Sequence, residues 1–388
     1  MKRSDTRILT THTGSLPRPG SLTELFTARA SGAAVDEERL KAEGRSAVAA
    51  ALAHQRECGI DVAGNGEQQR ESFVLYLRHR LSGLAGEGDR TGVADVESYP
   101  EFQKARSALL SSRPAVSNFA RLPKAVGPIA YTGHGALDDE CETFAHALES
   151  EGAGFSETFM TAPSPGILAA IVRNEHYETT EAYVAAVADA LRVEYERIVE
   201  RGHLLQLDCP DLALERHVSF KAKPLSQFLE FVELVVAAIN RALRNVPRDR
   251  VRLHVCWGNY EGPHDRDVPL NEILPILLRA NVGGLVLPFA NPRHAHEFKC
   301  LRTTPLAPDQ ILVAGVIDVL TNFVEHPEVV ADRLIRIAEA VGDPSRVLAG
   351  TDCGFDTSAG MGRVAPDVAW AKFKSLRDGA RLASEAMF

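Results

Sequence analysis

The chain has 388 residues, of which 45% are hydrophobic and 24% are charged, and its 43 basic and 52 acidic side chains give a net charge of -9. These proportions are typical of a soluble globular protein and exclude an extended disordered chain. The basic residues are interspersed with acidic ones and form no stripe, so we expect no nucleic-acid partner.

The N-terminal sequence and the cysteines indicate the cellular compartment in which the protein is expected. The segment MKRSDTRILTTHTGS has no apolar stretch of signal-peptide length, and no run of about eighteen apolar residues occurs anywhere. The six cysteines are too scattered for a disulfide scaffold. We therefore expect a cytoplasmic protein with reduced thiols and no membrane contact.

Short apolar, β-branched runs alternate along the chain with segments of helical period. The predicted strands cover residues 7–16, 59–67, 124–132, 203–210, 251–258, 283–290, 311–318 and 346–354. The predicted helices include residues 37–57, 181–201, 224–244 and 327–341, the last opening with Pro327. Nearly continuous apolar strands, each followed by a helix, predict a parallel α/β sheet closed as a (β/α)8 TIM barrel. A doubly wound sheet is the alternative.

Two regions depart from this repeat. Residues 83–120 are polar and rich in Gly, Ser, Arg and Glu, and residues 159–166 form the turn-rich stretch FMTAPSPG. We interpret both as elaborations of one barrel domain that spans residues 1–388, with residues 83–120 as an insertion.

Polar and metal-binding side chains collect where the predicted strands end. They are Gly14, Ser15, Glu67, Tyr131, Thr132, Asp208, His254, Cys256, Asn291, Asp318, Asp352 and Cys353. The loops at the C-terminal ends of barrel strands form the active-site face of this fold. The functional site is therefore expected at this end of the barrel.

The stretch RLHVCWGN places His254 and Cys256 two residues apart on a predicted strand. Alternate side chains of a strand point to the same face, so both can bind one ion. Zinc accepts imidazole and thiolate ligands, and a catalytic zinc keeps three protein ligands and one open position. Cys353, at the end of the last predicted strand, is the third candidate ligand. The alternative is a core histidine with two inert core cysteines.

Eight motifs, in order along the chain, resemble the cobalamin-independent methionine synthase family. They are THTGSLPRP, GNGEQQR, GPIAYTG, LLQLDCP, HVCWGN, FANPRHAHEF, GVID and AGTDCGF. The resemblance is to the family's C-terminal catalytic barrel and to single-barrel relatives that include epoxyalkane:coenzyme M transferase. It implies a TIM barrel of the methionine synthase and uroporphyrinogen decarboxylase type.

The resemblance also implies roles for individual residues. His254, Cys256 and Cys353 would bind Zn2+, while the Gly14 and Ser15 backbone, Glu67 and Asp208 would line a pocket for a thiol substrate. A zinc-bound thiol loses its proton near neutral pH and becomes a nucleophile. Carboxylates such as Glu67 and Asp208 are suited to hold the ammonium group of an amino thiol such as homocysteine.

Three features depart from the family pattern. The family has a further glutamate zinc ligand shortly before the segment matching Asn291 and Arg293, whereas LVLPFANPR contains no acid. The family's proton-donating histidine after the GVID aspartate is replaced by Leu320. The complete synthase also has a second, N-terminal barrel, and this chain has one.

Further polar residues lie near the expected mouth of the barrel. Glu325 and His326 open a helix after the seventh strand and are candidates for the missing proton donor, although helix capping explains them equally well. Tyr131 is a candidate to position or protonate the alkyl donor. Asn291 and Arg293 are candidates to orient a substrate carboxylate. His294 and His296 are expected on the solvated surface, and a place in the lining of the pocket is the alternative for either.

The sequence thus predicts a zinc-dependent barrel enzyme that alkylates a small thiol, most simply by methyl transfer to homocysteine. Its partners are expected to be a small-molecule thiol and an alkyl donor, and the oligomeric state stays open, a homo-oligomer included. Three alternatives remain: an epoxide-opening coenzyme M-type transferase, a metal-free decarboxylase on the related barrel, and a non-catalytic protein with a closed structural zinc site.

Overall fold

The computed structural model describes residues 1–388 except 89, 91, 112–114, 117–121 and 153. Part of the expected insertion, residues 89, 91, 112–114 and 117–120, therefore lies outside the described residues.

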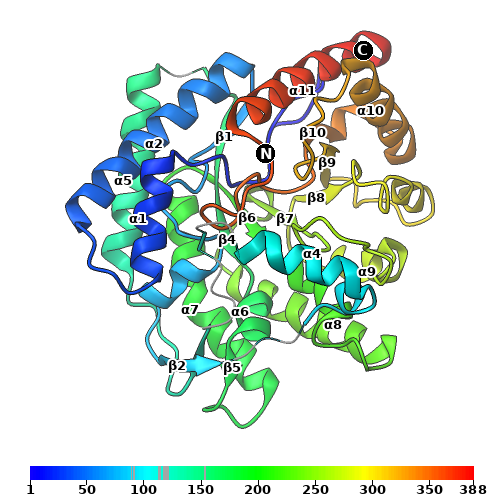
Figure 1. The fold of residues 1–388 in the computed structure, drawn as a ribbon. Coiled ribbons are helices and arrows are strands. Elements are labelled where there is room, and N and C mark those ends of the chain that lie inside the picture. The colour runs from blue at the N-terminus through cyan, green and yellow to red at the C-terminus, as the bar shows by residue number, and fades with distance from the viewer. Residues whose placement is uncertain (89, 91, 112–114, 117–121, 153) are drawn as a thin grey trace.

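A curled parallel sheet forms the centre of the molecule (Figure 1). In spatial order its strands are β1 (Val62–Gly64), β4 (Glu157–Pro163), β6 (Leu204–Asp208), β7 (Val251–His254), β8 (Gly284–Pro288), β9 (Ile311–Ile317) and β10 (Val347–Thr351). The N-terminal segment closes this sheet, because Thr10 pairs in parallel with Ala349 of β10 and Thr11 pairs in parallel with Val62 of β1. The segment and the strands together form the predicted (β/α)8 barrel.

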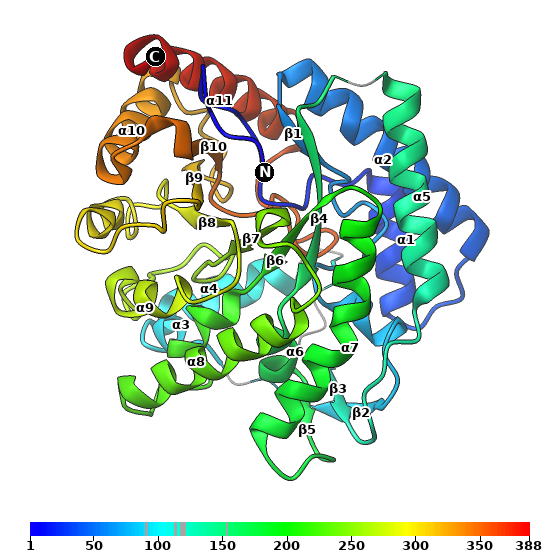
Figure 2. The ribbon, with the colours of Figure 1, turned by 180° about the vertical axis from the view of Figure 1, so that it is seen from behind.

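Helices surround the barrel (Figures 1 and 2). The α-helices are α1 (Gly20–Ala30), α2 (Glu37–Cys58), α3 (Ala94–Glu97), α4 (Pro100–Ser111), α5 (His134–Glu151), α6 (Pro165–Ile171), α7 (Thr180–Glu200), α8 (Leu225–Ala242), α9 (Leu270–Leu277), α10 (Pro327–Val341) and α11 (Pro366–Met387). Short 3-10 helices cover Leu75–His79, Pro210–Leu212, Leu214–His217, Arg248–Arg250, Glu297–Arg302 and Pro344–Arg346. In the part of the chain that the structure describes, no helix combines the length and the apolar character needed to cross a membrane.

Local sequence signals account for the ends of the helices. Asp36 caps α2 by accepting hydrogen bonds from the backbone of Glu38 and Arg39, and Gly59 ends the helix with a left-handed φ of 77°. Helix α10 begins at Pro327, with the His326 side chain at its N-cap. The predictions for α2, α7, α8 and α10 are confirmed to within about two residues.

The third predicted strand is wrong. Residues 124–132 contain Gly127 and Pro128, and only the start of this stretch belongs to a strand, β3 (Leu122–Ala125), while Tyr131 forms an isolated bridge with Leu81. The third barrel strand is β4, which the sequence analysis assigned to a turn-rich elaboration. The turn signal in FMTAPSPG belongs to the start of α6, where Ser164 caps the helix and Pro165 is its first residue.

The described residues between 84 and 125 lie outside the barrel sheet. They include α3, α4 and the strands β2 (Leu84–Gly88) and β3, which form a small sheet with β5 (Arg173–Asn174) in the order β2-β3-β5. Helix α4 lies across the front of the barrel in Figure 1. This segment therefore adds a cover to one end of the barrel.

A buried arginine connects several segments inside the barrel through hydrogen bonds and a ring contact. Arg252 of β7 is 1% exposed and lies 3.8 Å from the ring centroid of Phe159 on β4. Its guanidinium donates hydrogen bonds to Gln206 Oε1 of β6 at 2.8 Å, to Thr11 Oγ1 at 3.2 Å and to the His12 carbonyl at 3.0 Å. The N-terminal segment is thus bound to the middle of the sheet from inside.

The first prediction concerns this interior contact. Arg252→Ala leaves three buried acceptors on two segments, β6 and the N-terminal segment, without this donor, so we expect the free energy of unfolding to fall by about 3–5 kcal/mol. Urea denaturation at neutral pH measures the change. The control is Arg244→Ala, which removes an exposed ion pair with Asp189 and is expected to cost less than about 1 kcal/mol. Equal losses in the two variants would contradict the role of Arg252.

Candidate metal and substrate site

A cavity of about 490 Å3 lies at the C-terminal ends of the barrel strands. Six residues that the sequence analysis placed in the site line it together: Ser15, Glu67, Asp208, His254, Cys256 and Cys353. They come from the first and last thirds of the chain as well as from its middle. Closure of the barrel is therefore what brings them into one cavity.

His254, Cys256 and Cys353 form a compact group of metal-binding side chains. Their ligand atoms lie within 4.8 Å of one another, and the residues are only 3%, 7% and 8% exposed. His254 ends β7 and Cys256 follows it on the same face, while Cys353 follows β10. Gly315 of β9 allows the end of β10 to approach, because a Cβ at this position would lie 2.8 Å from the Asp352 Cα.

The imidazole of His254 is oriented by Asp208. The two residues are paired across β6 and β7, and His254 Nδ1 lies 3.0 Å from Asp208 Oδ1. Gln206 Nε2 donates to the same carboxylate oxygen at 2.8 Å. His254 Nε2 is buried and has no hydrogen-bond partner among the described residues. A histidine held through one nitrogen, with the other nitrogen free beside two thiols, fits a metal ligand.

The surroundings of the Cys256 thiol favour its ionised form. A hydrogen bond from Cys353 and the neighbouring His254 lower the pKa of Cys256 well below its ordinary value, against the opposing effect of burial. Thiolate is the form of cysteine that binds zinc. The donor set of one imidazole and two thiol groups therefore fits this metal.

The loop after β8 contributes no carboxylate to this group within the described residues. Pro288 and Ala290 stand in the region, and the backbone amides of Phe289, Ala290 and Asn291 donate hydrogen bonds to Asp352 at 2.7–3.0 Å. Asp352 thus fastens this loop to the end of β10. His254, Cys256 and Cys353 all line the main cavity, which has room for a further ligand.

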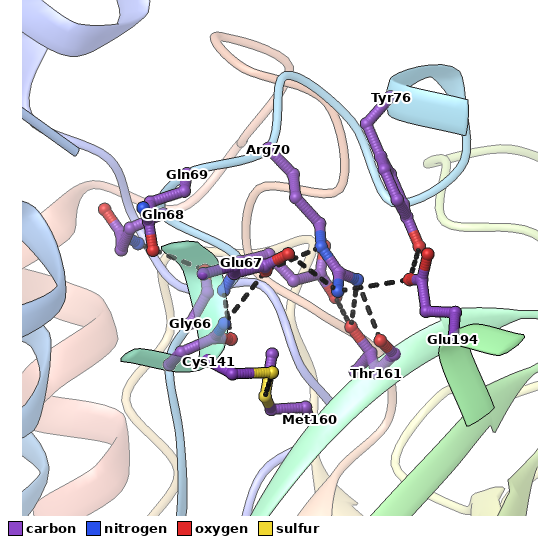
Figure 3. Close-up of polar contacts among 12 residues, drawn as sticks. Gly66, Glu67, Gln68, Gln69, Arg70, Tyr76, Cys141, Met160, Thr161 and Glu194 are labelled. Carbon is purple, nitrogen blue, oxygen red and sulfur yellow. Dashed lines mark hydrogen bonds and ion pairs between the residues drawn. The ribbon is translucent and has the colours of Figure 1, made fainter. Parts of the chain in front are cut away.

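Glu67 is held at the wall of the cavity by a buried polar network (Figure 3). Its Oε1 accepts a hydrogen bond from Thr161 Oγ1 at 3.0 Å, and Arg70 donates to the Thr161 carbonyl at 2.8 Å. Arg70 also forms an ion pair with Glu194 at 3.5 Å. Gly14 leaves space for this carboxylate, because a Cβ there would lie 2.6 Å from Glu67 Oε1.

The second oxygen of Glu67 is left without a partner. Glu67 is 2% exposed, and its Oε2 has no hydrogen bond among the described residues. Burial, and then the charge of Asp208, raise the pKa of Glu67 to about 7. The cavity therefore has a carboxyl group that a bound cation would convert to its charged form.

The far wall of the cavity was not predicted from the sequence. It is formed by Phe73, Val93, Arg90, Arg106, Ile167, Leu214, Val218 and Tyr260. Arg106 of α4 lies over the Tyr260 ring, 5.6 Å from its centroid, and its Nε has no hydrogen-bond partner among the described residues. The only signal in the sequence was the polar insertion itself, which carried no indication that it folds over the strand ends.

Glu325 and His326 do not line this cavity. Glu325 accepts a hydrogen bond from the Asp318 amide at 2.9 Å and forms an ion pair with buried Lys372 at 2.9 Å. His326 accepts a hydrogen bond from the Glu328 amide at the start of α10. The His326 contact corresponds to the capping alternative, whereas Glu325 binds outside the start of the helix, and the geometry gives no support to a proton-donor role for either residue.

Tyr131, Asn291 and Arg293 are also absent from the lining of the main cavity. The Tyr131 hydroxyl donates to Glu194 Oε2 at 2.7 Å, so this residue belongs to the network behind Glu67. Asn291 lines a smaller cavity of about 30 Å3, and its side chain accepts a hydrogen bond from the Arg293 amide. Arg293 Nε donates to the His264 carbonyl at 3.2 Å.

The expectation for His294 is wrong, because this residue is 4% exposed, whereas His296 lies on the surface as expected. The His294 side chain is enclosed by Trp257, whose ring stacks on it at a centroid distance of 4.1 Å. Because NPRHAHEF is mostly polar, nothing in the sequence indicated that His294 is buried.

Comparison with known proteins supports the assignment from the motifs. Residues 8–109 match the family model described as the cobalamin-independent synthase, catalytic domain. A methionine synthase from Sulfolobus acidocaldarius is 26% identical over 89% of this chain and 85% of its own length. A methionine synthase from Saccharolobus solfataricus is 25% identical over 97% of this chain and 95% of its own length.

Solved structures give the same fold. A B12-independent methionine synthase from a Shewanella species, in complex with selenomethionine, superposes with a TM-score of 0.71 at 22% identity, covering 98% of this chain and 99% of that protein. The fold, the order of the motifs and the full-length relatives all support the cobalamin-independent methionine synthase family.

Proposed function

We propose that this protein is a zinc-dependent methyltransferase whose acceptor is a small amino thiol, with homocysteine as the most direct candidate. The observation that carries the proposal is that His254, Cys256 and Cys353 line the same cavity as Glu67 and Asp208. The relatives described above are methionine synthases, which agrees with methyl transfer to a thiol.

The three proposed zinc ligands and the carboxylates of the site have different roles. When bound, zinc lowers the pKa of a coordinated thiol, so that the acceptor is a thiolate at neutral pH. Asp208 holds His254 in one orientation, and Gln206 and Arg252 support Asp208 from inside the barrel. The thiolate sulfur forms a bond to the methyl carbon, and the electron pair of the broken bond leaves with the donor, which takes up a proton.

The free oxygen of Glu67 suits the ammonium group of the acceptor. It is buried, unpartnered within the described residues, and faces the cavity that contains the metal ligands. The remaining wall includes the apolar side chains of Phe73, Ile167 and Val218, which disfavour water beside the reacting groups.

The alternatives fit this geometry less well. A sulfonate thiol of the coenzyme M type would meet the carboxylates of Glu67 and Asp208, which repel it. A decarboxylase without a metal does not require the arrangement of His254, Cys256 and Cys353. A closed structural zinc site needs a fourth protein ligand, and the cluster contains three among the described residues.

The second prediction tests the metal ligands. Cys256→Ser and Cys353→Ser each remove a thiolate, so zinc content is expected to fall from about one ion per chain to a small fraction, with loss of methyl transfer to homocysteine. Elemental analysis and a thiol methylation assay measure the two effects. Cys209→Ala is the matched control, since Cys209 is buried nearby but its thiol donates to the Leu207 carbonyl. A wild-type chain without bound zinc under non-stripping conditions would overturn the proposal.

The third prediction concerns the orientation of His254. Asp208→Asn keeps the size of the side chain but removes its charge, so zinc affinity is expected to fall about 10–100-fold. Competition with a chromophoric chelator measures the affinity. Asp211→Asn is the control, because Asp211 is also buried but accepts its hydrogen bond from Ser164. Unchanged affinity in Asp208→Asn would show that His254 needs no such support.

The fourth prediction follows from the raised pKa of Glu67. Because the pKa of this carboxyl group is about 7, it becomes charged as the pH rises through neutrality and only then pairs with an ammonium. The KM for homocysteine should therefore decrease between about pH 6 and pH 8 more steeply than the KM for its analogue without the amino group.

The analogue corrects for the pH dependence of thiol ionisation, which both substrates share. In Glu67→Gln the extra pH dependence should disappear, and kcat/KM for homocysteine should fall about 10–100-fold, as expected for the loss of a charged hydrogen bond. If the KM values of the two thiols depended equally on pH in the wild-type enzyme, Glu67 would not bind the ammonium group.

A further inference from the structure

A second group of metal-binding side chains lies in the loops that follow β7 and β8. His264, Asp267 and His294 each offer one ligand atom, and these atoms lie within 4.8 Å of one another. Their side chains are only 3%, 4% and 5% exposed. We propose that these three residues bind a divalent transition-metal ion, separate from the zinc site of His254, Cys256 and Cys353.

The two imidazoles converge on one carboxylate. Asp267 Oδ2 lies 2.9 Å from His264 Nδ1 and 2.7 Å from His294 Nε2. The other oxygen, Oδ1, has no hydrogen-bond partner within the described residues, although His217 Nδ1 lies 3.0 Å away. Asp267 is therefore a buried carboxylate surrounded by three imidazoles, and this concentration of donor atoms around one negative charge suits a cation.

The outer nitrogens of both rings also have acceptors. His264 Nε2 lies 2.9 Å from the Tyr260 carbonyl, and His294 Nδ1 lies 2.8 Å from Glu297 Oε2. Metal-binding histidines typically donate their second N–H to a backbone carbonyl or a carboxylate, which fixes the ring and its tautomer. Both histidines show this arrangement.

A divalent ion can replace two buried protons of this cluster without changing its net charge. Without one, all four ring nitrogens face acceptor oxygens, so each imidazole must carry two protons and two positive charges are buried side by side. A divalent ion replaces the two inner protons, and each ring then keeps only the outer N–H. The carboxylates of Asp267 and Glu297 together neutralise such an ion.

The rings are held in place by stacking. Trp257 stacks on His294 with a centroid distance of 4.1 Å, and Tyr260 stacks on His264 at 4.4 Å. Because the backbone and both rings are fixed by packing, the three donors stay together without a metal. The site is therefore preorganised for binding.

The donor set differs from that of the zinc site. Two imidazoles and one carboxylate with open positions are typical of Fe2+ and related ions such as Mn2+ and Co2+, whereas thiolates favour zinc. His264 and His294 share a cavity of about 30 Å3 with Cys256 and Cys353. This volume has room for at least one water ligand.

The test uses Co2+ as the probe, because its absorption spectrum reports the ligands. The chain is freed of metal with a chelator and titrated with Co2+ under anaerobic conditions. We expect the wild-type chain to bind about two ions and the double variant Cys256→Ser with Cys353→Ser to bind about one, without sulfur-to-cobalt charge-transfer absorption. Adding Asp267→Asn or His294→Gln to the double variant should abolish this remaining binding.

Two further variants complete the design. Glu297→Gln weakens the support of His294, so Co2+ affinity at the second site should fall about 10–100-fold, even where Asp267→Asn does not fold. His203→Gln changes a buried histidine that contacts Thr158 on another strand, and it should leave both sites intact.

The proposal is overturned if the thiol-free double variant, shown to be folded by circular dichroism, binds no Co2+. It is also overturned if binding survives both Asp267→Asn and His294→Gln. These results are independent of methyl transfer, because the zinc site can fail while the second site binds cobalt, and the second site can fail while the enzyme methylates its thiol.

Discussion

The contact between Asp208 and His254 is the interaction on which the main site depends. An imidazole has two nitrogens, and only the one that faces the thiols can join them on a metal. Asp208 occupies Nδ1, and the parallel register of β6 and β7 sets the two residues side by side. Gln206 binds the same carboxylate, and Arg252 binds Gln206 in turn. The orientation of His254 therefore depends on a chain of hydrogen bonds that extends into the barrel interior.

Arg252 also connects this chain of contacts to barrel closure. Its bonds to Thr11 and to the His12 carbonyl hold the N-terminal segment that pairs with both β1 and β10. The same segment leads directly to Ser15, and β10 leads to Cys353, which both line the main cavity. A substitution in the barrel interior can thus affect the site without touching a ligand, because the two ends of the chain meet there.

The sequence predicted those parts of the site that follow from local periodicity. Strand alternation put His254 and Cys256 on one face, and the end of the last strand identified Cys353. It did not predict β4, because the proline and glycine that follow the strand obscured it, or the position of Tyr131, because Gly127 and Pro128 break the stretch before it. The burial of His294 and the cover formed by α4 depend on contacts between distant segments. Arg106, for example, meets Tyr260 only in the folded chain.

The two donor sets are close in space but differ in their chemistry. Cys256 and Cys353 belong to a soft set, whereas His264, Asp267 and His294 belong to a harder one, and one small cavity touches both. Soft and hard ligands select different ions when several metals are present, but a single metal in excess fills any site of suitable geometry. If only zinc were supplied, zinc would then also fill the proposed site of His264, Asp267 and His294, in place of the ion that this donor set prefers. Since Trp257 follows Cys256 in the sequence and stacks on His294, an ion bound by His294 would also influence the position of the loop that carries Cys256, one of the proposed zinc ligands.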